Sequence, residues 1–417
     1  MNIKKQEQNF DMVIIGGLGH VGLPLGLSFA NEGLKVCLYD VDGSKAEMVR
    51  QGIMPFIEYG AEPILKKVLR NGTLTISLDM GVVSQAKYVV VAIGTPVDEY
   101  LSPQLRPFLG LFTQLNKYLD PTQIIIIRST VYPRTCRQIT NFLDSKKGPW
   151  HIAYCPERIV QGYAIKELKE LPQLVAGLTP TAEKEAYELF SILSPKVLKV
   201  SMEEAELAKL FSNAWRYIQF AVANQFYMVS HYFGVDFNQL RHVMMDSYGR
   251  LATLPSAGFA AGPCLLKDTM QLVASYNNNF SLGHAAMIVN EGLPNFIIEN
   301  LKIRFNLAKT KVGILGMTFK SDIDDIRDSL SYKLVKILHF HGAEVLCSDE
   351  YVKDPGFVSK EKILQTCKIV IIGVPHSQYK GLEIPDNIEV VDLWGVTQKK
   401  KISERSPVIF KSKVTVE

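Results

Sequence analysis

The chain has 417 residues, 47% of them hydrophobic and 21% charged, which is the composition of an ordinary globular protein. This length exceeds what one hydrophobic core organises, so we expect two or three domains. The net charge of +4 is small and dispersed along the chain, which argues against a nucleic-acid partner.

The cysteines and the hydropathy pattern exclude further classes. The six cysteines are scattered, with no Cys-x-x-Cys spacing and no paired framework, so they predict a reducing compartment and no metal site. Residues 1–11 are polar and lack the apolar core of a signal peptide. No apolar run approaches the roughly 18 residues of a membrane span. We therefore expect a cytoplasmic protein without a membrane partner.

The first pattern along the chain is an apolar run at 12–16, followed by a glycine turn at 17–22 and a helical pattern at 23–32. A second apolar run at 34–39 ends on Asp40, about 20 residues after the turn. Strand, glycine turn, helix, strand and acid in this order form the fingerprint of a dinucleotide-binding domain.

Each part of this fingerprint has a physical role. Gly17 makes the turn, Gly19 lets a pyrophosphate approach the backbone, and Gly22 lets the helix pack on the sheet. Asp40 would accept hydrogen bonds from a ribose 2′-hydroxyl, and no arginine follows it directly, which favours NAD over NADP. The cofactor contacts expected in this segment are Gly17, Gly19, His20, Val21, Gly22 and Asp40.

Two further strands are expected at 88–93 and 123–127. They end in Gly94-Thr95-Pro96 and in Arg128-Ser129-Thr130. Ligands of an open parallel sheet bind beyond the carboxyl ends of its strands, so Thr95 and Thr130 are placed to meet the nicotinamide half of the cofactor. The alternative is that both threonines cap helices.

The middle of the chain is predicted to be helical. One long helix is expected at 202–233, followed by helices at 237–248 and 282–301. A long helix that links two domains commonly also forms a dimer interface, so we expect a homodimer. The broad apolar stripe of the long helix comprises Leu207, Leu210, Phe211, Ala214, Ile218, Ala221, Val222 and Gln225.

Two motifs in this middle region carry polar groups. Lys209 and Asn213 are four residues apart on the long helix and therefore share one face. Cys264 follows a run of small residues, and Asp268 would lie one helical turn after it. A reactive thiolate needs a helix N-terminus or a nearby cation, and Lys267 and Lys209 are candidates for that cation. The alternatives are a solvated lysine and a cysteine that simply packs in the core.

The C-terminal third repeats the doubly wound pattern. Strands are expected at 311–316, at 343–347 near Asp349, and at 368–373. Its glycine turn is incomplete, so it is expected to bind something other than a second dinucleotide, or nothing. The predicted fold class is α/β, with two Rossmann-like doubly wound domains joined by a long central helix and an all-helical middle domain.

Seven motifs occur in register along nearly the whole chain. Together they resemble those of the nucleotide-sugar 6-dehydrogenases, the family of UDP-glucose, UDP-N-acetylhexosamine and GDP-mannose dehydrogenases. The motifs are the glycine fingerprint, Gly94-Thr95-Pro96, Ser129-Thr130, Cys155-Pro156-Glu157-Arg158, Lys209-x-x-x-Asn213, Gly262-x-Cys264-x-x-Lys267-Asp268, and Phe319-Lys320 with Asp324-Asp325-Ile326-Arg327-Asp328-Ser329.

The resemblance implies a four-electron oxidation of a sugar CH2OH to a carboxylate with two NAD. Cys264 would capture the aldehyde as a thiohemiacetal, which becomes a thioester that water hydrolyses. Asp268 through water, or Lys209, would be the base, and Asp268 and Glu157 would position the hydrolytic water. Lys209 and Asn213 would stabilise oxyanions. The implied catalytic residues are Cys264, Lys209, Asn213, Asp268, Glu157 and Thr130.

The resemblance also implies binding residues and domain boundaries. Arg327 and Lys320 would reach the sugar diphosphate, because guanidinium forks suit phosphate. Arg250 would meet the substrate of a neighbouring subunit. Cofactor contacts outside the fingerprint would be Thr95, Thr130, Lys267 and Arg327. The implied substrate contacts are Glu157, Arg158, Lys209, Asn213, Arg250, Phe259, Gly262, Phe319 and Lys320. The domains are expected at 1–200 (NAD-binding), 201–305 (central helical and dimerising, carrying the cysteine loop) and 306–417 (nucleotide-sugar-binding).

Some features depart from the family pattern and leave the sugar open. Ala260, Ala261 and Pro263 stand where the family usually has glycines, which restricts the backbone of the cysteine loop. Residues 157–168 resemble the N-acetylhexosamine group, whereas 266–268 resemble the glucose and GDP-mannose groups. The prediction leans toward a UDP-N-acetylhexosamine, with UDP-glucose or GDP-mannose as alternatives.

Two rival functions share part of the pattern. The first two-thirds of the chain also resembles the 6-phosphogluconate and β-hydroxyacid dehydrogenases, which perform a single oxidation and need no thiol. The second doubly wound domain and the Cys264 loop argue against them. The other rival is a non-catalytic nucleotide or NAD sensor on the same fold. The presence of Lys209, Asn213, Cys264 and Asp268 argues against a sensor.

Overall fold

The computed structural model describes residues 9–95, 97–98, 104–144 and 147–397. The chain divides into two compact units, Met1–Ser212 with Met270–Asn279, and Asn213–Thr269 with Phe280–Glu417. Two helices contribute residues to both units: α8 (Met202–Tyr232) and α10 (Leu265–Ser275).

The first unit is built on an eight-stranded sheet in the order β3-β2-β1-β4-β5-β6-β7-β8. Its strand pairs are parallel except for β6 with β7. The strands are β1 (Phe10–Ile15), β2 (Val36–Tyr39), β3 (Leu74–Ser77), β4 (Ala86–Val91), β5 (Ile124–Ile127), β6 (His151–Tyr154), β7 (Gln173–Gly177) and β8 (Val197–Lys199). The helices are α1 (Gly22–Asn31), α2 (Gly43–Arg50), α3 (Ala61–Arg70), α4 (Leu105–Leu115), α5 (Thr135–Ile139), α6 (Ala164–Glu170) and α7 (Pro180–Phe190), with the 3-10 turns η1 (Met80–Gln85) and η2 (Thr140–Phe142).

Successive residues of the central strands face opposite sides of this sheet, as strand geometry requires. Met12 and Ile14 lie in one core with residues of α1, α3 and α7. Val13 and Ile15 lie in a second core with residues of α4 and α5. Strands buried on both faces explain why the sequence shows continuous apolar runs instead of alternation.

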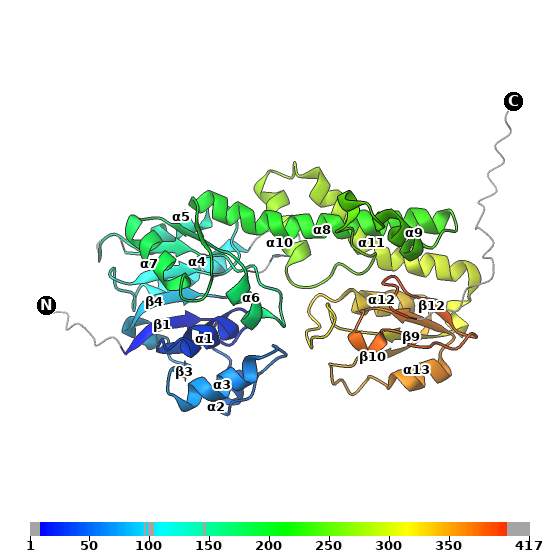
Figure 1. Ribbon diagram of the computed structural model, residues 1–417, viewed down its shortest axis with the longest axis horizontal. Helices are drawn as coiled ribbons and strands as arrows, with labels where there is room; N and C mark the ends of the chain where they lie inside the picture. The colour runs from blue at the N-terminus through cyan, green and yellow to red at the C-terminus, as the bar shows by residue number, and fades with distance from the viewer. Residues whose placement is uncertain (1–8, 96, 99–103, 145–146, 398–417) are drawn as a thin grey trace. The chain divides into compact units, whose positions relative to one another are not determined.

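The second unit holds a four-stranded parallel sheet in the order β10-β9-β11-β12. Its helices α12 and α13 cover opposite faces, and residues of α11 join the core on the α12 side (Figure 1). The strands are β9 (Lys311–Leu315), β10 (Glu344–Ser348), β11 (Ile369–Ile372) and β12 (Glu389–Val391). The remaining elements are α9 (Phe237–Met245), α11 (Ser281–Arg304), α12 (Leu330–Phe340), α13 (Lys360–Thr366), η4 (Gly249–Leu251), η5 (Leu307–Lys309) and η6 (Ser377–Tyr379).

These elements confirm the predicted fold class: two largely parallel doubly wound sheets and a helical middle. The long helix ends at Tyr232, one residue before its predicted end. The residues of its predicted apolar stripe do not share one environment. Leu210, Ala214 and Ala221 are buried, whereas Phe211 and Val222 are exposed.

Candidate active site

Gly17 in the turn after β1 and Gly22 at the start of α1 both leave room only for glycine. A Cβ atom at Gly17 would lie 2.8 Å from the Cα atom of Leu38, and one at Gly22 would overlap the carbonyl oxygen of Gly16. At Gly19 a Cβ atom would meet only that carbonyl, at 3.4 Å, so this side of the turn is open. No side chain caps α1, so its N-terminal end presents backbone N–H groups and the positive end of the helix dipole. The turn therefore fits the pyrophosphate of a dinucleotide.

Asp40 lies directly after β2 and is tied to this turn. Its Oδ2 atom accepts a hydrogen bond from the backbone N–H of Leu18 at 3.0 Å, and its Oδ1 atom accepts one from the N–H of Val41 at 2.8 Å. The carboxylate is half-buried and retains acceptor capacity. His20 stacks on Phe56, with ring centroids 3.9 Å apart.

Thr95 and Thr130 lie beyond the carboxyl ends of β4 and β5. The Thr95 hydroxyl donates a hydrogen bond to the carbonyl oxygen of Thr130 at 2.6 Å, so it joins two loops and does not cap a helix. The residue at the N-cap of α5 is Arg134, so Thr130 does not cap that helix either. Pro96, the last residue of the predicted Gly-Thr-Pro motif, lies outside the described residues.

Glu157 is a buried carboxylate whose main partner the sequence did not reveal. Arg128, at the end of β5, is 1% exposed and forms an ion pair with Glu157. The second carboxylate oxygen of Glu157 accepts hydrogen bonds from the N–H groups of Arg158 at 2.6 Å and Ile159 at 2.8 Å. The Arg158 guanidinium donates to the carbonyl oxygen of Pro172, and burial lowers its pKa. A charged residue directly after four isoleucines was the signal that could have identified Arg128.

Lys209 and Asn213 lie one turn apart on α8, and both are buried, at 8% and 7% exposed. The side-chain amide of Asn213 donates a hydrogen bond to Asp268 Oδ2 at 2.5 Å. Asp268 is fully buried, and its Oδ1 atom forms an ion pair with Lys267 Nζ at 3.0 Å. Asn213 and Lys267 thus hold this carboxylate from two directions.

Cys264 immediately precedes α10, and its carbonyl oxygen accepts a hydrogen bond from the N–H of Asp268 at 2.8 Å. The predicted one-turn spacing of cysteine and acid is therefore present. Cys264 is the exposed cysteine of the six. Burial raises the pKa of Cys37 and Cys155 to about 12 and that of Cys347 to about 11, so these thiols stay protonated at neutral pH. Accessibility sets Cys264 apart from the others.

Other predicted site residues lie in the second unit, some of them in the segment before Cys264. Gly262 has a φ of 98°, and a Cβ atom on it would overlap the Phe319 ring. Phe259 is buried in the core with residues of α11 and α12. Lys320 is half-buried in the loop between β9 and α12. Arg250 lies in η4, with its guanidinium 6.0 Å from the Tyr248 ring.

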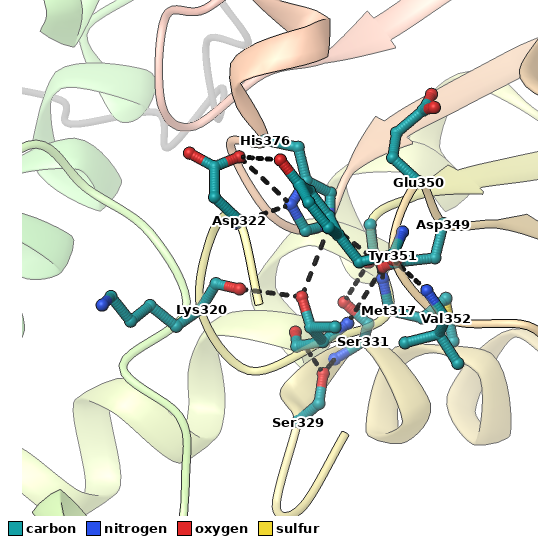
Figure 2. Close-up of polar contacts among 12 residues, drawn as sticks. Met317, Lys320, Asp322, Ser329, Ser331, Asp349, Glu350, Tyr351, Val352 and His376 are labelled. Atoms are coloured by element: carbon teal, nitrogen blue, oxygen red, sulfur yellow. Dashed lines mark hydrogen bonds and ion pairs between the residues drawn. The ribbon is translucent and has the colours of Figure 1, made fainter. Parts of the chain in front are cut away.

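The loop between β9 and α12 contacts a partly buried polar cluster that the sequence analysis did not predict. Figure 2 shows Asp349, Tyr351, His376 and Asp322 directed toward one another. His376 is fully buried, with its Nε2 atom 3.0 Å from Asp349 Oδ2, and its Nδ1 atom accepts the N–H of Asp322 at 3.0 Å. The Tyr351 hydroxyl donates to Asp322 Oδ1 at 3.0 Å. Burial alone would raise the pKa of Asp349, but hydrogen bonds from His376 and backbone N–H groups lower it.

Asp349 occupies the same place in the second sheet as Asp40 in the first. Each follows the second strand of its fold, and each accepts the first N–H groups of the preceding turn: Leu18 for Asp40, and Met317, at 2.6 Å, for Asp349. The difference is that His376 covers Asp349. The glycine turn of the second sheet is incomplete, as the sequence indicated. The acid that follows its second strand, Asp349, already accepts hydrogen bonds from within the protein.

Models of one family match nearly the whole described chain. The NAD-binding domain of the UDP-glucose/GDP-mannose dehydrogenase family matches residues 11–194, its central domain matches 203–292, and its UDP-binding domain matches 313–399. The chain belongs to this family. It is an NAD-dependent nucleotide-sugar dehydrogenase, as the order of its motifs predicted.

Individual relatives are distant but similar over nearly their full length. A UDP-N-acetyl-D-mannosamine dehydrogenase of Pyrococcus horikoshii is 26% identical over 381 residues, covering 89% of this chain and 90% of the relative. An NDP-N-acetyl-D-galactosaminuronic acid dehydrogenase of Ralstonia nicotianae is 23% identical, covering 95% and 98%. The solved structure of a UDP-glucose dehydrogenase from Pyrobaculum islandicum is 25% identical, with a TM-score of 0.84 and coverage of 95% and 96%.

Two further observations concern the residues of this dehydrogenase that the structure describes. Within the described ranges, no helix has the length and apolar character that a membrane crossing requires. Among the same residues, no three His, Cys, Asp or Glu side chains are grouped so that they could hold a metal ion.

Proposed function

We propose that this dehydrogenase oxidises the C6 CH2OH group of a UDP-N-acetylhexosamine to a carboxylate, through a covalent intermediate on Cys264. The observation that carries the proposal is the accessible thiol of Cys264 one turn before a fully buried Asp268, which Asn213 and Lys267 hold in place. A single oxidation of an alcohol needs no nucleophile, whereas conversion of an aldehyde to an acid gains from one.

The residues that would hold NAD are those of the glycine turn, with its open side at Gly19, together with Asp40, Thr95 and Thr130. When bound, NAD supplies the hydride acceptor for each of two oxidations, so two NADH form per carboxylate. Lys267 and Arg327 are further proposed cofactor contacts. The remaining chemistry falls to side chains of the chain itself.

Cys264 acts between the two oxidations. Its thiolate forms a C–S bond with C6 at the aldehyde level, which gives a thiohemiacetal and keeps the aldehyde on the protein. After the second oxidation the same bond is that of a thioester. Water adds to C6, the C–S bond breaks, and the thiolate leaves as the carboxylate forms. The overall reaction consumes one water and returns the cysteine unchanged.

The buried polar groups have roles suited to this sequence. Asp268 accepts the proton of the attacking water, and Asn213 and Lys209 stabilise the oxyanions that form at C6. The carboxylate of Glu157 is fixed by Arg128 and two backbone N–H groups, so we assign it to holding water and not to transferring a proton. Arg158, Arg250, Phe259, Gly262, Phe319 and Lys320 are the proposed substrate contacts.

The proposed sugar rests on relatives and on sequence. Two relatives that are similar over nearly their full length are named for N-acetylated sugars, UDP-N-acetyl-D-mannosamine and an N-acetyl-D-galactosaminuronic acid. The run at 157–168 resembles the same group. A UDP-glucose dehydrogenase of similar fold keeps UDP-glucose as the second candidate.

The test is the number of NADH formed per sugar consumed, with the product identified by mass. The substrates are UDP-glucose, the UDP-linked N-acetyl derivatives of glucosamine, mannosamine and galactosamine, and GDP-mannose. About two NADH per uronic acid from one N-acetylhexosamine is the expected result. One NADH per aldehyde or ketone product would assign the chain to single-step dehydrogenases. Normal turnover by Cys264→Ser would remove the thiol from the reaction.

A further inference from the structure

The cysteine loop, defined as residues 257–264, packs against the loop between β9 and α12 within the second unit. The backbone N–H of Gly262 donates a hydrogen bond to the carbonyl oxygen of Asp328 at 3.3 Å. The left-handed φ of Gly262 and the absence of a Cβ atom let the Phe319 ring lie directly against it. These contacts bring Cys264, two residues after Gly262, close to Arg327, the residue before Asp328.

Arg327 is held in place by a buried partner. Its guanidinium donates to Asp325 through Nε at 3.0 Å and through Nη2 at 2.6 Å. The Asp325 side chain is only 5% exposed, whereas that of Arg327 is 54% exposed, so the carboxylate anchors a guanidinium that extends toward the surface. The hydrogen bonds that Arg327 donates to Asp325 raise the pKa of Arg327, and the nearby Cys264 raises it further. Interaction between two charges is mutual, so the same proximity favours the thiolate.

Other charged groups lie on α10, on α8 and in the β9–α12 loop. On its own helix, Lys267 is already paired with Asp268. From α8, Asn213 contributes no charge, and Lys209 lies one turn before it. In the β9–α12 loop, Asp325 is bound to Arg327, and the charge of Asp328 also raises the pKa of Arg327. Arg327 is thus a cation that the contacts of the cysteine loop place near Cys264.

We propose that Arg327, anchored by Asp325, is the cation that keeps the Cys264 sulfur deprotonated for attack on C6. Cys264 also lies at the start of α10, where the helix dipole acts in the same direction. The inference rests on the proposed function for its purpose, but the state of the thiol is measurable without turnover. It gives Arg327 a role beyond contact with phosphate.

The test is the rate of iodoacetamide alkylation of Cys264 in the intact protein as a function of pH, followed by mass spectrometry of the Cys264 peptide. In Arg327→Met, the midpoint of this profile should rise by about one pH unit, and alkylation at neutral pH should slow about tenfold. Arg327→Lys keeps the charge and should retain most of the wild-type rate. The matched control is Arg304→Met, which removes an arginine of the same unit that is paired with Glu389.

The buried cysteines report on folding in the same experiment, because they react only if the chain opens. If they react in Arg327→Met, then Arg327→Gln replaces it, since glutamine removes the charge but can still donate a hydrogen bond to Asp325. An unchanged pH profile in a folded neutral variant would overturn the inference. This result would leave the proposed function intact, because that proposal is tested separately by the number of NADH formed per sugar and by the turnover of Cys264→Ser.

Discussion

At the scale of single residues, the polar groups of the candidate site are held by partners far away in sequence. Arg128 pairs with Glu157 and also donates to the carbonyl oxygen of Cys155 at 2.9 Å and to Gln173 Oε1 at 2.6 Å. Asn213 reaches Asp268 across 55 residues. Fixed groups of this kind need no reorganisation when charge develops on a substrate, which is the condition for electrostatic catalysis.

The Arg128 pair yields a prediction on stability. Arg128→Met should lower the free energy of unfolding by about 3–5 kcal/mol, because it leaves the Glu157 carboxylate buried without its cation. The double variant Arg128→Met with Glu157→Gln should recover part of this loss, because no buried charge remains. Urea denaturation followed by circular dichroism measures both. Arg137→Met, which breaks an exposed pair with Glu203, is the control and should leave the urea midpoint nearly unchanged.

At the scale of elements, α8 positions the cysteine loop through one buried amide. Asn224 accepts the N–H of Gly258 at 2.8 Å and donates to its carbonyl oxygen at 3.0 Å, so it pairs with the backbone as a strand would. It also donates to Asn290 on α11 at 2.9 Å, and Asn290 donates to the carbonyl oxygen of Tyr217 at 3.0 Å. The start of the cysteine loop is thereby fixed to two helices.

Removal of this amide should loosen the loop. Asn224→Ala leaves the Gly258 N–H and the Asn290 carbonyl buried without partners, and should lower the free energy of unfolding by about 2–3 kcal/mol. Amide exchange at Gly258 should accelerate more than exchange in the β9–β12 sheet. Gln225→Ala, at the next and exposed position of α8, is the matched control. Equal amide exchange rates at Gly258 in the two variants would contradict the role of Asn224 in holding the cysteine loop.

The opposite face of α8 carries large apolar side chains that no described residue covers. Trp215, Val222, Phe226 and Val229 are 41–61% exposed, and their spacing places them along one side of the helix. Exposed apolar stripes of this kind mark interaction surfaces. The sequence prediction of a homodimer through this helix therefore remains our proposal.

Phe226→Glu tests this dimer. A charge in the centre of the stripe should shift the mass measured by light scattering from two chains toward one, because an unpaired carboxylate opposes burial of the interface. Gln225→Glu adds the same charge beside the stripe and should leave the mass unchanged. A wild-type protein that is monomeric at all concentrations would refute the proposed interface.

At the scale of the whole molecule, the sequence predicted the features that neighbouring residues determine, such as strands and turns. It did not predict the contacts between residues that are distant in sequence. Apolar runs and glycine turns identified both doubly wound sheets, since local periodicity and turn chemistry decide these elements. The one-turn spacing of Cys264 and Asp268 was predicted for the same reason. Long-range pairs, such as Arg128 with Glu157 or His376 with Asp349, leave no local pattern. These residues come together only when the chain folds.

The two sheets place an acid at equivalent positions and use it differently, which leads to a prediction for the intact protein. Asp40 retains acceptor capacity, whereas Asp349 is covered by His376 and occupied by backbone N–H groups. Calorimetric titration should therefore find one NAD per chain. Asp40→Asn should weaken NAD binding about tenfold or more, because it removes a charged acceptor. Asp349→Asn should destabilise the protein but leave NAD affinity unchanged, because its carboxylate has no acceptor atom left for a ribose. A second NAD per chain, lost in Asp349→Asn, would show that the His376 cover opens.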